Sequence, residues 1–386
     1  MIRILFGGMN VMAIYLDYAA STPFDRDILS AVFESTDTYG NPSSTHKLGK
    51  EAKSMLETNR AKIAKYINAS PQEIIITSGA TEANNLAIKG IVNQHDRPHV
   101  ITTNVEHSSV KSTYELLESQ CDVTYLQVKK NGRIDVEDLK HALREDTVLV
   151  SIILVNNETG VIQPVYEIAE VLKDRDTLLH LDAVQSFGHV DVDVEALGAD
   201  LLSLSAHKIY GPKGVGILYC KKNTKLNSLI TGGLHEAGRR AGTENNMWTG
   251  AMALAMEKVV ENKTERNIKE MQLKELFLNE LQVNAIPFDV NGDVNHASPH
   301  ILNVYFPWVD VQVLLTALDL RDVYISGGSA CNSGSVKPSH VITAMYDDAR
   351  ASHSVRFSFS YLNTEEEIKE TVEVLKNIYE SLKATA

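Results

Sequence analysis

The chain has 386 residues, of which 44% are hydrophobic and 23% charged, as is typical of a globular enzyme with one large and one smaller domain. Its formal net charge of -13 at pH 7 argues against a broad nucleic-acid-binding surface. The three cysteines, Cys121, Cys220 and Cys331, lie far apart, which argues against a disulfide framework and a metal centre and predicts a cytoplasmic protein.

The first residues do not resemble a membrane anchor. Residues 1–14 are mildly apolar, but Gly7, Gly8 and Asn10 interrupt them and no small-residue cleavage pattern follows. A run this short does not span a bilayer. We therefore expect an N-terminal extension over residues 1–14 and no transmembrane span elsewhere.

Short apolar runs alternate with helical patterns between about residue 70 and residue 220. The runs are Glu73–Thr77, His99–Thr103, Val148–Val155, Leu178–Asp182, Asp200–Leu204 and Val215–Cys220. Almost continuous apolar strands separated by helices indicate a mostly parallel sheet with helices on both faces. Ligands of such α/β folds bind beyond the carboxyl ends of the strands, and the polar candidates below follow these runs.

The remainder of the chain predicts a second, smaller unit. Residues 247–283 have a long helical pattern, and the runs Ser298–Tyr305 and Val311–Leu318 begin an α+β segment. We expect a domain boundary near residue 262, with a large domain over 15–262 and a small α+β domain over 263–386. The residues Thr-Glu-Glu-Glu from Thr364 form a capping box that opens a last helix over Thr364–Lys383.

Residues 74–88, IIITSGATEANNLAI, predict a strand, a turn of small residues and the start of a helix. Free backbone N–H groups at a helix start bind phosphate, and the Thr81 hydroxyl adds a donor. On its own, the segment fits a capped helix without a ligand better. It is neither a dinucleotide fingerprint nor a P-loop, because Gly-x-Gly-x-x-Gly and Gly-Lys-Ser/Thr are both missing.

Lys208 lies between an apolar strand and a glycine-rich turn in residues 203–216, SLSAHKIYGPKGVG. Desolvation lowers the pKa of a lysine and frees its lone pair for attack on an aldehyde. The segment therefore suits a Schiff base with pyridoxal phosphate, a cofactor that also needs a phosphate site and an acid for its pyridine nitrogen.

Asp182 and His107 both follow predicted strands. A carboxylate at the buried end of a strand can hold a pyridinium proton, although Asp182 fits a helix N-cap equally well. His107 fits general acid–base chemistry, and in isolation it fits an ordinary hydrogen-bonded histidine better.

Three further positions suit substrate chemistry. Asn157, in the loop NNETG, could reach a ring oxygen or a carboxylate, or simply form a turn. Arg356, in an alternating strand, could clamp an α-carboxylate or pair with a structural acid. Cys331 lies in the glycine- and serine-rich run ISGGSACNSGSVK, which suits a thiol that moves between a buried site and an external acceptor. Cys121 and Cys220, beside apolar residues, fit small buried hydrophobes.

From residue 15 to about residue 383 the chain resembles the cysteine desulfurases of the class V pyridoxal-phosphate aminotransferase-like group. The resemblance rests on YLDYAASTP from Tyr15, NPSSTH from Asn41, TSGATE from Thr77 and GGLHE from Gly232. It implies a fold-type I transferase with a mostly parallel seven-stranded sheet between helices, pyridoxal 5'-phosphate as cofactor, and a homodimer with composite active sites.

The same resemblance implies roles for the candidate residues. Lys208 holds the cofactor, and His107 stacks on its ring and handles protons. Asp182 binds the pyridine nitrogen and Gln185 the ring hydroxyl. The phosphate is bound by Ala80, Thr81, Ser205 and His207, joined by Thr243 from a second subunit. Asn157 and Arg356 bind the substrate carboxylate.

Cys331 matches the persulfide-carrying cysteine of the family, and its surroundings resemble the long-loop, NifS/IscS-type subgroup. This implies removal of sulfur from L-cysteine to give L-alanine and a persulfide on Cys331, which passes to an iron–sulfur scaffold or a tRNA-thiolating enzyme. A selenocysteine lyase, a class V aminotransferase for another amino acid and a non-catalytic scaffold are the alternatives. The chain departs from the family at residues 359–361, where Phe-Ser-Tyr replaces Leu-Gly and a basic residue.

Overall fold

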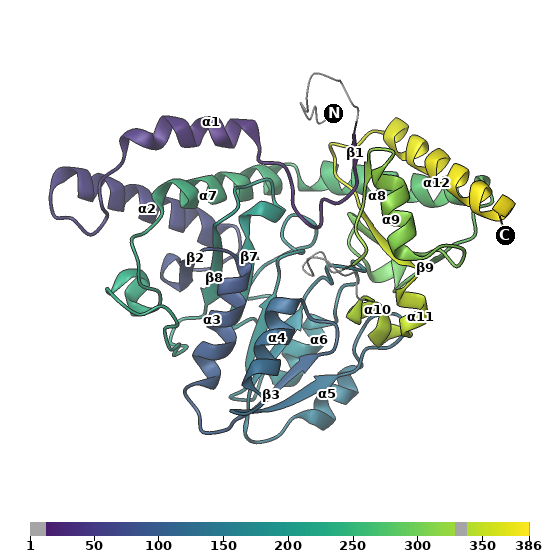
Figure 1. Ribbon diagram of the computed structural model, residues 1–386. Coiled ribbons are helices and arrows are strands. Elements are labelled where there is room, and N and C mark those ends of the chain that lie inside the picture. Colours follow the sequence, from purple (N-terminus) through teal and green to yellow (C-terminus); the bar gives the residue numbers. More distant parts are fainter. Residues whose placement is uncertain (1–12, 329–337, 386) are drawn as a thin grey trace.

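The computed structural model describes residues 13–328 and 338–385. Figure 1 shows two groups of elements: a large sheet with its helices, and the C-terminal elements α8, α9 and α12 gathered beside it around β1 and β9. None of the described helices has the length and apolar character needed to cross a membrane.

Within the described residues, the large sheet has seven strands in the order β2-β8-β7-β6-β5-β3-β4. The strands from β7 to β4 are parallel, and β8 is antiparallel to both of its neighbours. The predicted mostly parallel seven-stranded sheet is therefore confirmed. Their bounds are β2 Ile74–Thr77, β3 His99–Thr103, β4 Asp122–Leu126, β5 Thr147–Ile153, β6 Leu178–Asp182, β7 Leu201–Ser205 and β8 Gly216–Cys220.

Helices cover both faces of this sheet. Ile101 and Val150 belong to one buried cluster, whereas their neighbours Val100 and Leu149 belong to another on the opposite face. This double coverage explains the continuous apolar runs. The helices are α1 Arg26–Glu34, α2 Lys47–Lys65, α3 Ala80–Val92, α4 Ser108–Leu117, α5 Val136–Ala142, α6 Val165–Leu172 and α7 Asn246–Glu261. The 3-10 turns of the chain are η1 Ser35–Asp37, η2 Pro71–Glu73, η3 Ala206–Lys208, η4 His235–Gly238 and η5 Val294–His296.

The C-terminal elements form a separate buried cluster that includes Leu16, Phe277, Phe306 and Phe357. A three-stranded sheet has the order β12-β10-β9, and β1 pairs with β11. The strands are β1 Ile14–Tyr15, β9 Asp289–Val290, β10 Ile301–Tyr305, β11 Val323–Tyr324 and β12 Ser354–Ser358. The helices are α8 Lys263–Val283, α9 Val311–Asp319, α10 His340–Met345, α11 Asp348–Ala351 and α12 Glu365–Thr385. Residues at the N-terminal end of the described chain thus pack among the C-terminal elements.

Two local expectations are corrected by the structure. The long helical stretch is divided at Asn262, which has φ -109° and ψ 11°. The strand that carries Arg356 is buried at every position rather than alternating. The capping box is confirmed, because Glu367 N donates to Thr364 Oγ1 and Thr364 N to the Glu367 carboxylate. The domain boundary near residue 262 stays a prediction.

Candidate active site

Lys208 ends η3, directly after β7, and its amine faces the N-terminal segment of the chain. Its Nζ donates to the carbonyl oxygens of Ala19 and Ala20, the latter at 2.8 Å. The segment is fixed to this turn by Thr22, whose backbone N–H and hydroxyl both donate to the carbonyl of His207 at 3.0 Å. The lysine is therefore held between a strand end and a segment that is distant in sequence.

A glycine allows this turn to approach α3. Gly216, at the start of β8, lies so close to its neighbours that a Cβ there would be 2.5 Å from Leu204 O and 2.8 Å from Gly79 Cα. Any larger residue would push the strand that precedes Lys208 away from the turn that precedes α3. At Gly216, the glycine that ends the run after Lys208, packing therefore requires a residue without a side chain.

Asp182 ends β6, the strand beside β7, and is 3% exposed. Its Oδ2 accepts a 2.8 Å hydrogen bond from Asn84 Nδ2, and its Oδ1 accepts one of 3.1 Å from Val184 N. The residues that follow Asp182 form turns, and no helix begins in the fully described stretch between β6 and β7, so the helix N-cap alternative is wrong. Asn84 lies on α3 inside the motif that predicted a phosphate site, but the sequence reasoning did not identify it.

His107 is joined to this carboxylate through two side chains. Asn84 Nδ2 also donates to Ser109 Oγ at 2.9 Å, and Ser109 Oγ lies 2.8 Å from His107 Nδ1. Burial lowers the pKa of His107, the positive charge of Lys208 lowers it further, and Asp182 opposes both. Because His107 Nδ1 accepts from Ser109 N at 3.1 Å, the neutral ring carries its proton on Nε2.

Gln185 donates a hydrogen bond to the same backbone carbonyl as Lys208, that of Ala19. Its Nε2 donates to Ala19 O at 2.8 Å, and its Oε1 lies 3.3 Å from His300 Nε2. The Ala19 carbonyl therefore contacts both Gln185, which follows β6, and Lys208, which follows the neighbouring strand β7. His300 was not identified from the sequence, because it lies 115 residues beyond Gln185.

The start of α3 has the features of an anion site. Gly79, the N-cap, has φ 152° and no side chain caps the helix. A Cβ added at Gly79 would meet nothing within 4 Å, so the turn that precedes α3 borders open space. Glu82, in the first turn of α3, accepts from Ser78 N at 2.8 Å and is paired with Arg240 at 2.9 Å. This pairing reduces the repulsion that a bound anion would meet.

Ser205 and His207 flank the Lys208 turn. Ser205 ends β7 and is 4% exposed. His207 Nδ1 lies 3.3 Å from Ser21 Oγ, and burial lowers the pKa of His207 to about 4. Its ring is therefore neutral at neutral pH and offers one N–H donor.

Thr243 lies apart from these residues. It is exposed on the segment between β8 and α7, and among the described contacts none joins it to another predicted site residue. This segment is anchored at Glu236, whose carboxylate pairs with the buried Arg60 at 2.6 and 2.8 Å and accepts from Ile76 N at 3.1 Å.

Arg356, 3% exposed on β12, brings together three parts of the chain. Its Nη1 donates to the Asn157 carbonyl at 2.8 Å and its Nη2 to Asp17 Oδ1 at 2.7 Å. Arg356 Nε and Asn157 Oδ1 are buried without a hydrogen-bond partner among the described residues. Asp17 was not identified from the sequence, although it lies in the first motif of the resemblance.

Of the three cysteines, the structure describes Cys121 and Cys220. Cys331 lies outside the described residues. Cys121 and Cys220 are each 1% exposed, and burial raises the pKa of each thiol to about 11. Both are unreactive thiols at neutral pH. No cluster of metal-ligating side chains occurs in the described part of the chain.

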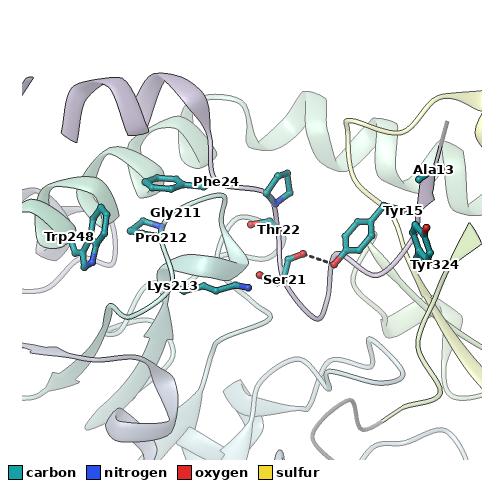
Figure 2. A pocket seen from close by; sticks show the side chains of 11 residues that line it. Ala13, Tyr15, Ser21, Thr22, Phe24, Gly211, Pro212, Lys213, Trp248 and Tyr324 are labelled. Carbon is teal, nitrogen blue, oxygen red and sulfur yellow. Dashed lines mark hydrogen bonds between the residues drawn. The ribbon is translucent and has the colours of Figure 1, made fainter. Parts of the chain in front are cut away.

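A cavity of about 600 Å³ lies beside the segment that contacts Lys208. Figure 2 shows Lys213 extending toward Ser21, and Tyr15, whose hydroxyl donates to Ser21 O at 3.0 Å. Aromatic side chains, Phe24 and Trp248 on one side and Tyr324 on the other, line much of it. Lys208, Asp182 and His107 do not line this cavity, so it is a neighbour of the candidate site rather than its centre.

Comparison with known proteins gives a consistent result. The family Aminotransferase class-V matches residues 14–371. A protein named putative cysteine desulfurase IscS 1, from Bacillus subtilis (strain 168), is 44% identical over 375 residues, covering 96% of this chain and 99% of that protein. The cysteine desulfurase IscS of Dictyoglomus turgidum is 42% identical over 375 residues, covering 96% of this chain and 95% of that protein.

Solved structures agree with the sequences. A NifS-like protein has a TM-score of 0.89 at 34% identity, covering 95% of this chain and 99% of that one. A structure titled SspA in complex with cysteine has a TM-score of 0.78 at 37% identity, covering 90% of this chain and 98% of that one.

Proposed function

The chain belongs to the aminotransferase class-V family and is a cysteine desulfurase that depends on pyridoxal phosphate, and we propose that Lys208, His107 and Cys331 carry its reaction. The observation that supports this assignment most directly is the hydrogen-bonded chain from His107 through Ser109 and Asn84 to Asp182. It couples the proposed acid–base group to the proposed partner of the pyridine nitrogen.

The residues present fit the cofactor. The uncapped start of α3, with open space at Gly79, fits the phosphate group. We propose that Ala80, Thr81, Ser205 and His207 bind it there. The buried carboxylate of Asp182 would hold the pyridine nitrogen, and Gln185 would bind the ring hydroxyl through the second N–H of its amide.

Pyridoxal phosphate, when bound, supplies an aldehyde that bonds to amines and a ring that withdraws electrons from the substrate Cα. Lys208 is the amine best placed to hold it, because two backbone carbonyls fix its Nζ. As a free amine, Lys208 would also accept the proton of the substrate Cα. Arg356 and Asn157 would orient the substrate through its carboxylate, using the Arg356 Nε that has no partner among the described residues.

His107 is suited to the proton of the substrate thiol. A proton acceptor must be neutral before the reaction, and burial lowers the pKa of His107 below its ordinary value. Its Nδ1 is occupied by Ser109. The resting ring carries its proton on Nε2, which cannot accept a second one, so His107 would take the thiol proton at Nε2 only in its other neutral tautomer, with the Nδ1 proton donated to Ser109 Oγ.

Cys331 would take the sulfur atom itself. Its thiolate attacks the substrate sulfur, an S–S bond forms, and the substrate C–S bond breaks with its electron pair left on carbon. Protonation of that carbon gives L-alanine. One sulfur atom has then moved from L-cysteine to Cys331 without any external oxidant or reductant.

The partners follow from the same proposal. The exposed position of Thr243, away from the other phosphate-binding residues, supports its contribution to the site of a second subunit in a homodimer. The persulfide would pass to an acceptor protein, either an iron–sulfur scaffold or a tRNA-thiolating enzyme. Two free, buried thiols among the described residues fit a reducing, cytoplasmic location.

An activity assay on purified protein tests the assignment. With L-cysteine and a reducing thiol, the wild type should form equal amounts of sulfide and alanine. Lys208→Ala should lose the visible absorbance band of the bound cofactor together with both products. Wild-type protein that stays colourless after cofactor addition, or that forms no alanine, would contradict the assignment.

A further inference from the structure

A second cavity, of about 390 Å³, lies where α1, α7 and α8 meet the turn after Lys208. Its apolar wall contains Ile28, Ile209 and Val259. Charged and polar residues complete it: Asp25, Lys258, Asn262, Glu265, Arg266 and Lys269, with the rings of Tyr210 and Tyr361. Because Ile209 and Tyr210 directly follow Lys208, the cavity borders the turn that carries the proposed cofactor lysine.

Arg266, in the first turn of α8, is the unusual member of this set. It is 7% exposed, yet in residues 13–328 and 338–385 it forms no ion pair and its Nε has no hydrogen-bond partner. The acid one turn along the helix, Glu270, is fully buried; it lies 3.1 Å from His189 Nδ1, forms no ion pair with Arg266, and its carboxylate has no hydrogen-bond partner among the described residues. A buried guanidinium without an acid is costly, so this residue has an unused capacity to bind an anion.

Two aromatic rings hold Arg266 in place. Its Cζ lies 4.7 Å from the ring centroid of Tyr210 and 4.6 Å from that of Tyr361. Cation–π contacts of this kind fix a guanidinium but leave its N–H edges available for hydrogen bonds. Tyr361 is one of the three positions, 359–361, at which the chain departs from the family pattern, so this departure supplies one of the two rings.

The other charges in the cavity already have partners or repel anions. Lys258 is paired with Asp25 and Asp27 at 2.8 Å each, and Lys269 donates to the carbonyl of Tyr361 at 2.6 Å. Asp25 and the exposed Glu265 add negative charge at the wall. A multiply charged anion would meet repulsion here, whereas a single carboxylate needs only the fork of Arg266.

We propose that this cavity binds a small monocarboxylate, with its carboxylate on Arg266 and a short apolar body against Ile28, Ile209 and Val259. A planar carboxylate matches the paired N–H groups of a guanidinium. The three aliphatic side chains give the apolar body of the ligand a surface to pack against, and inorganic phosphate has no apolar body to use it. The site is separate from the one that binds L-cysteine, so its failure would leave the proposed desulfurase function intact.

Butyrate is a suitable probe, because it has no amine to react with the cofactor. Calorimetric titration of the holoenzyme should show saturable binding of butyrate that is tighter than binding of inorganic phosphate. Arg266→Gln should weaken it at least about tenfold. The matched control, Arg321→Gln, removes a guanidinium that donates to Ala317 O on α9 and should leave the affinity unchanged.

A variant that binds butyrate more tightly would show that the effect of Arg266→Gln is not simply a loss of folded structure. Glu265→Gln removes an exposed negative charge from the wall without touching the aromatic support, and should tighten butyrate binding up to about fivefold. The proposal is overturned if the wild type shows no saturable binding, if Arg266→Gln or Glu265→Gln leaves the affinity unchanged, if phosphate binds more tightly, or if binding is lost in Arg356→Gln instead.

Discussion

The amide oxygen of Gln185 fixes the tautomer of the His300 imidazole. Gln185 Nε2 donates to Ala19 O at 2.8 Å, so its Oε1 is the atom that lies 3.3 Å from His300 Nε2. A carbonyl oxygen only accepts, and therefore His300 carries its proton on Nε2 and accepts on Nδ1 from Ser298 Oγ, 3.1 Å away. Burial lowers the pKa of His300 well below its ordinary value, which keeps this neutral form in place.

His300→Ala should therefore change the environment of the cofactor ring without removing a residue that touches it. The buried Oε1 of Gln185 would lose its donor, at a cost of about 1–3 kcal/mol, and the amide would be able to rotate. We expect a shifted pH titration of the cofactor absorbance band, partly restored by His300→Gln, which keeps an N–H donor. The control, His296→Ala, replaces an exposed histidine paired with Asp293. Identical titrations in His300→Ala and wild type would contradict this role.

Asn84→Ala should weaken cofactor binding through Asp182. Asn84 donates to the carboxylate at 2.8 Å, and hydrogen bonds to charged groups contribute about 1.5–3 kcal/mol. The dissociation constant of pyridoxal phosphate, measured by equilibrium dialysis, should rise about tenfold to a hundredfold. Asn85→Ala is the matched control, because that amide donates to Thr81 O within its own helix. An equal effect of both substitutions would show that only helix stability had changed.

Glu236→Gln should be strongly destabilising. The carboxylate forms two hydrogen bonds to the buried Arg60, and removing one partner of a buried ion pair costs about 3–5 kcal/mol. Glu57, which is half exposed and lies 3.3 Å from Arg60 Nε, offers the comparison: Glu57→Gln should cost less than about 1 kcal/mol. Urea denaturation would measure both, and similar losses would contradict the importance of the Glu236 anchor.

Glu106 should make the stability of the protein depend on pH. It is fully buried, and burial raises its pKa to about 8, against about 4.3 in an unfolded chain. The folded state then binds a proton that the unfolded state has lost, so this stabilising contribution is present below pH 4.3 and is lost as pH rises through 8.

Glu106→Gln keeps a neutral side chain at every pH and should remove that dependence. Urea midpoints at pH 5, 7 and 9 should fall with pH more steeply in the wild type than in the variant. Parallel curves would show that Glu106 is ionised in the folded protein.

The sequence predicted the elements whose signal is local. Leu178–Asp182 and His99–Thr103 were predicted with the bounds observed, because strands covered on both faces have continuous apolar runs. The edge strand Asp122–Leu126 was missed because four of its five residues are partly exposed and its composition is mixed. The alternation expected around Arg356 was wrong because Val355 and Phe357 face the C-terminal cluster while Arg356 faces Asp17, so both sides are covered.

The supports of the site could not be predicted in the same way. Asn84 and Asp182 are 98 residues apart, and Arg356 and Asp17 are 339 apart. Each pair is brought together only by the order of the strands and by the N-terminal segment returning to Lys208. The candidate residues themselves were found because they follow strands or lie in motifs, whereas their hydrogen-bond partners have no local signal.

The central claim is that Cys331 takes the sulfur atom of L-cysteine as a persulfide. Mass spectrometry of the holoenzyme after one turnover without a reducing thiol tests this claim most directly. The peptide that contains Cys331 should gain the mass of one sulfur atom, while those of Cys121 and Cys220 stay unchanged and one alanine forms per active site. Cys331→Ser should keep the cofactor absorbance but gain no sulfur and release no sulfide. A gained sulfur on another cysteine, or normal sulfide release by Cys331→Ser, would contradict the account.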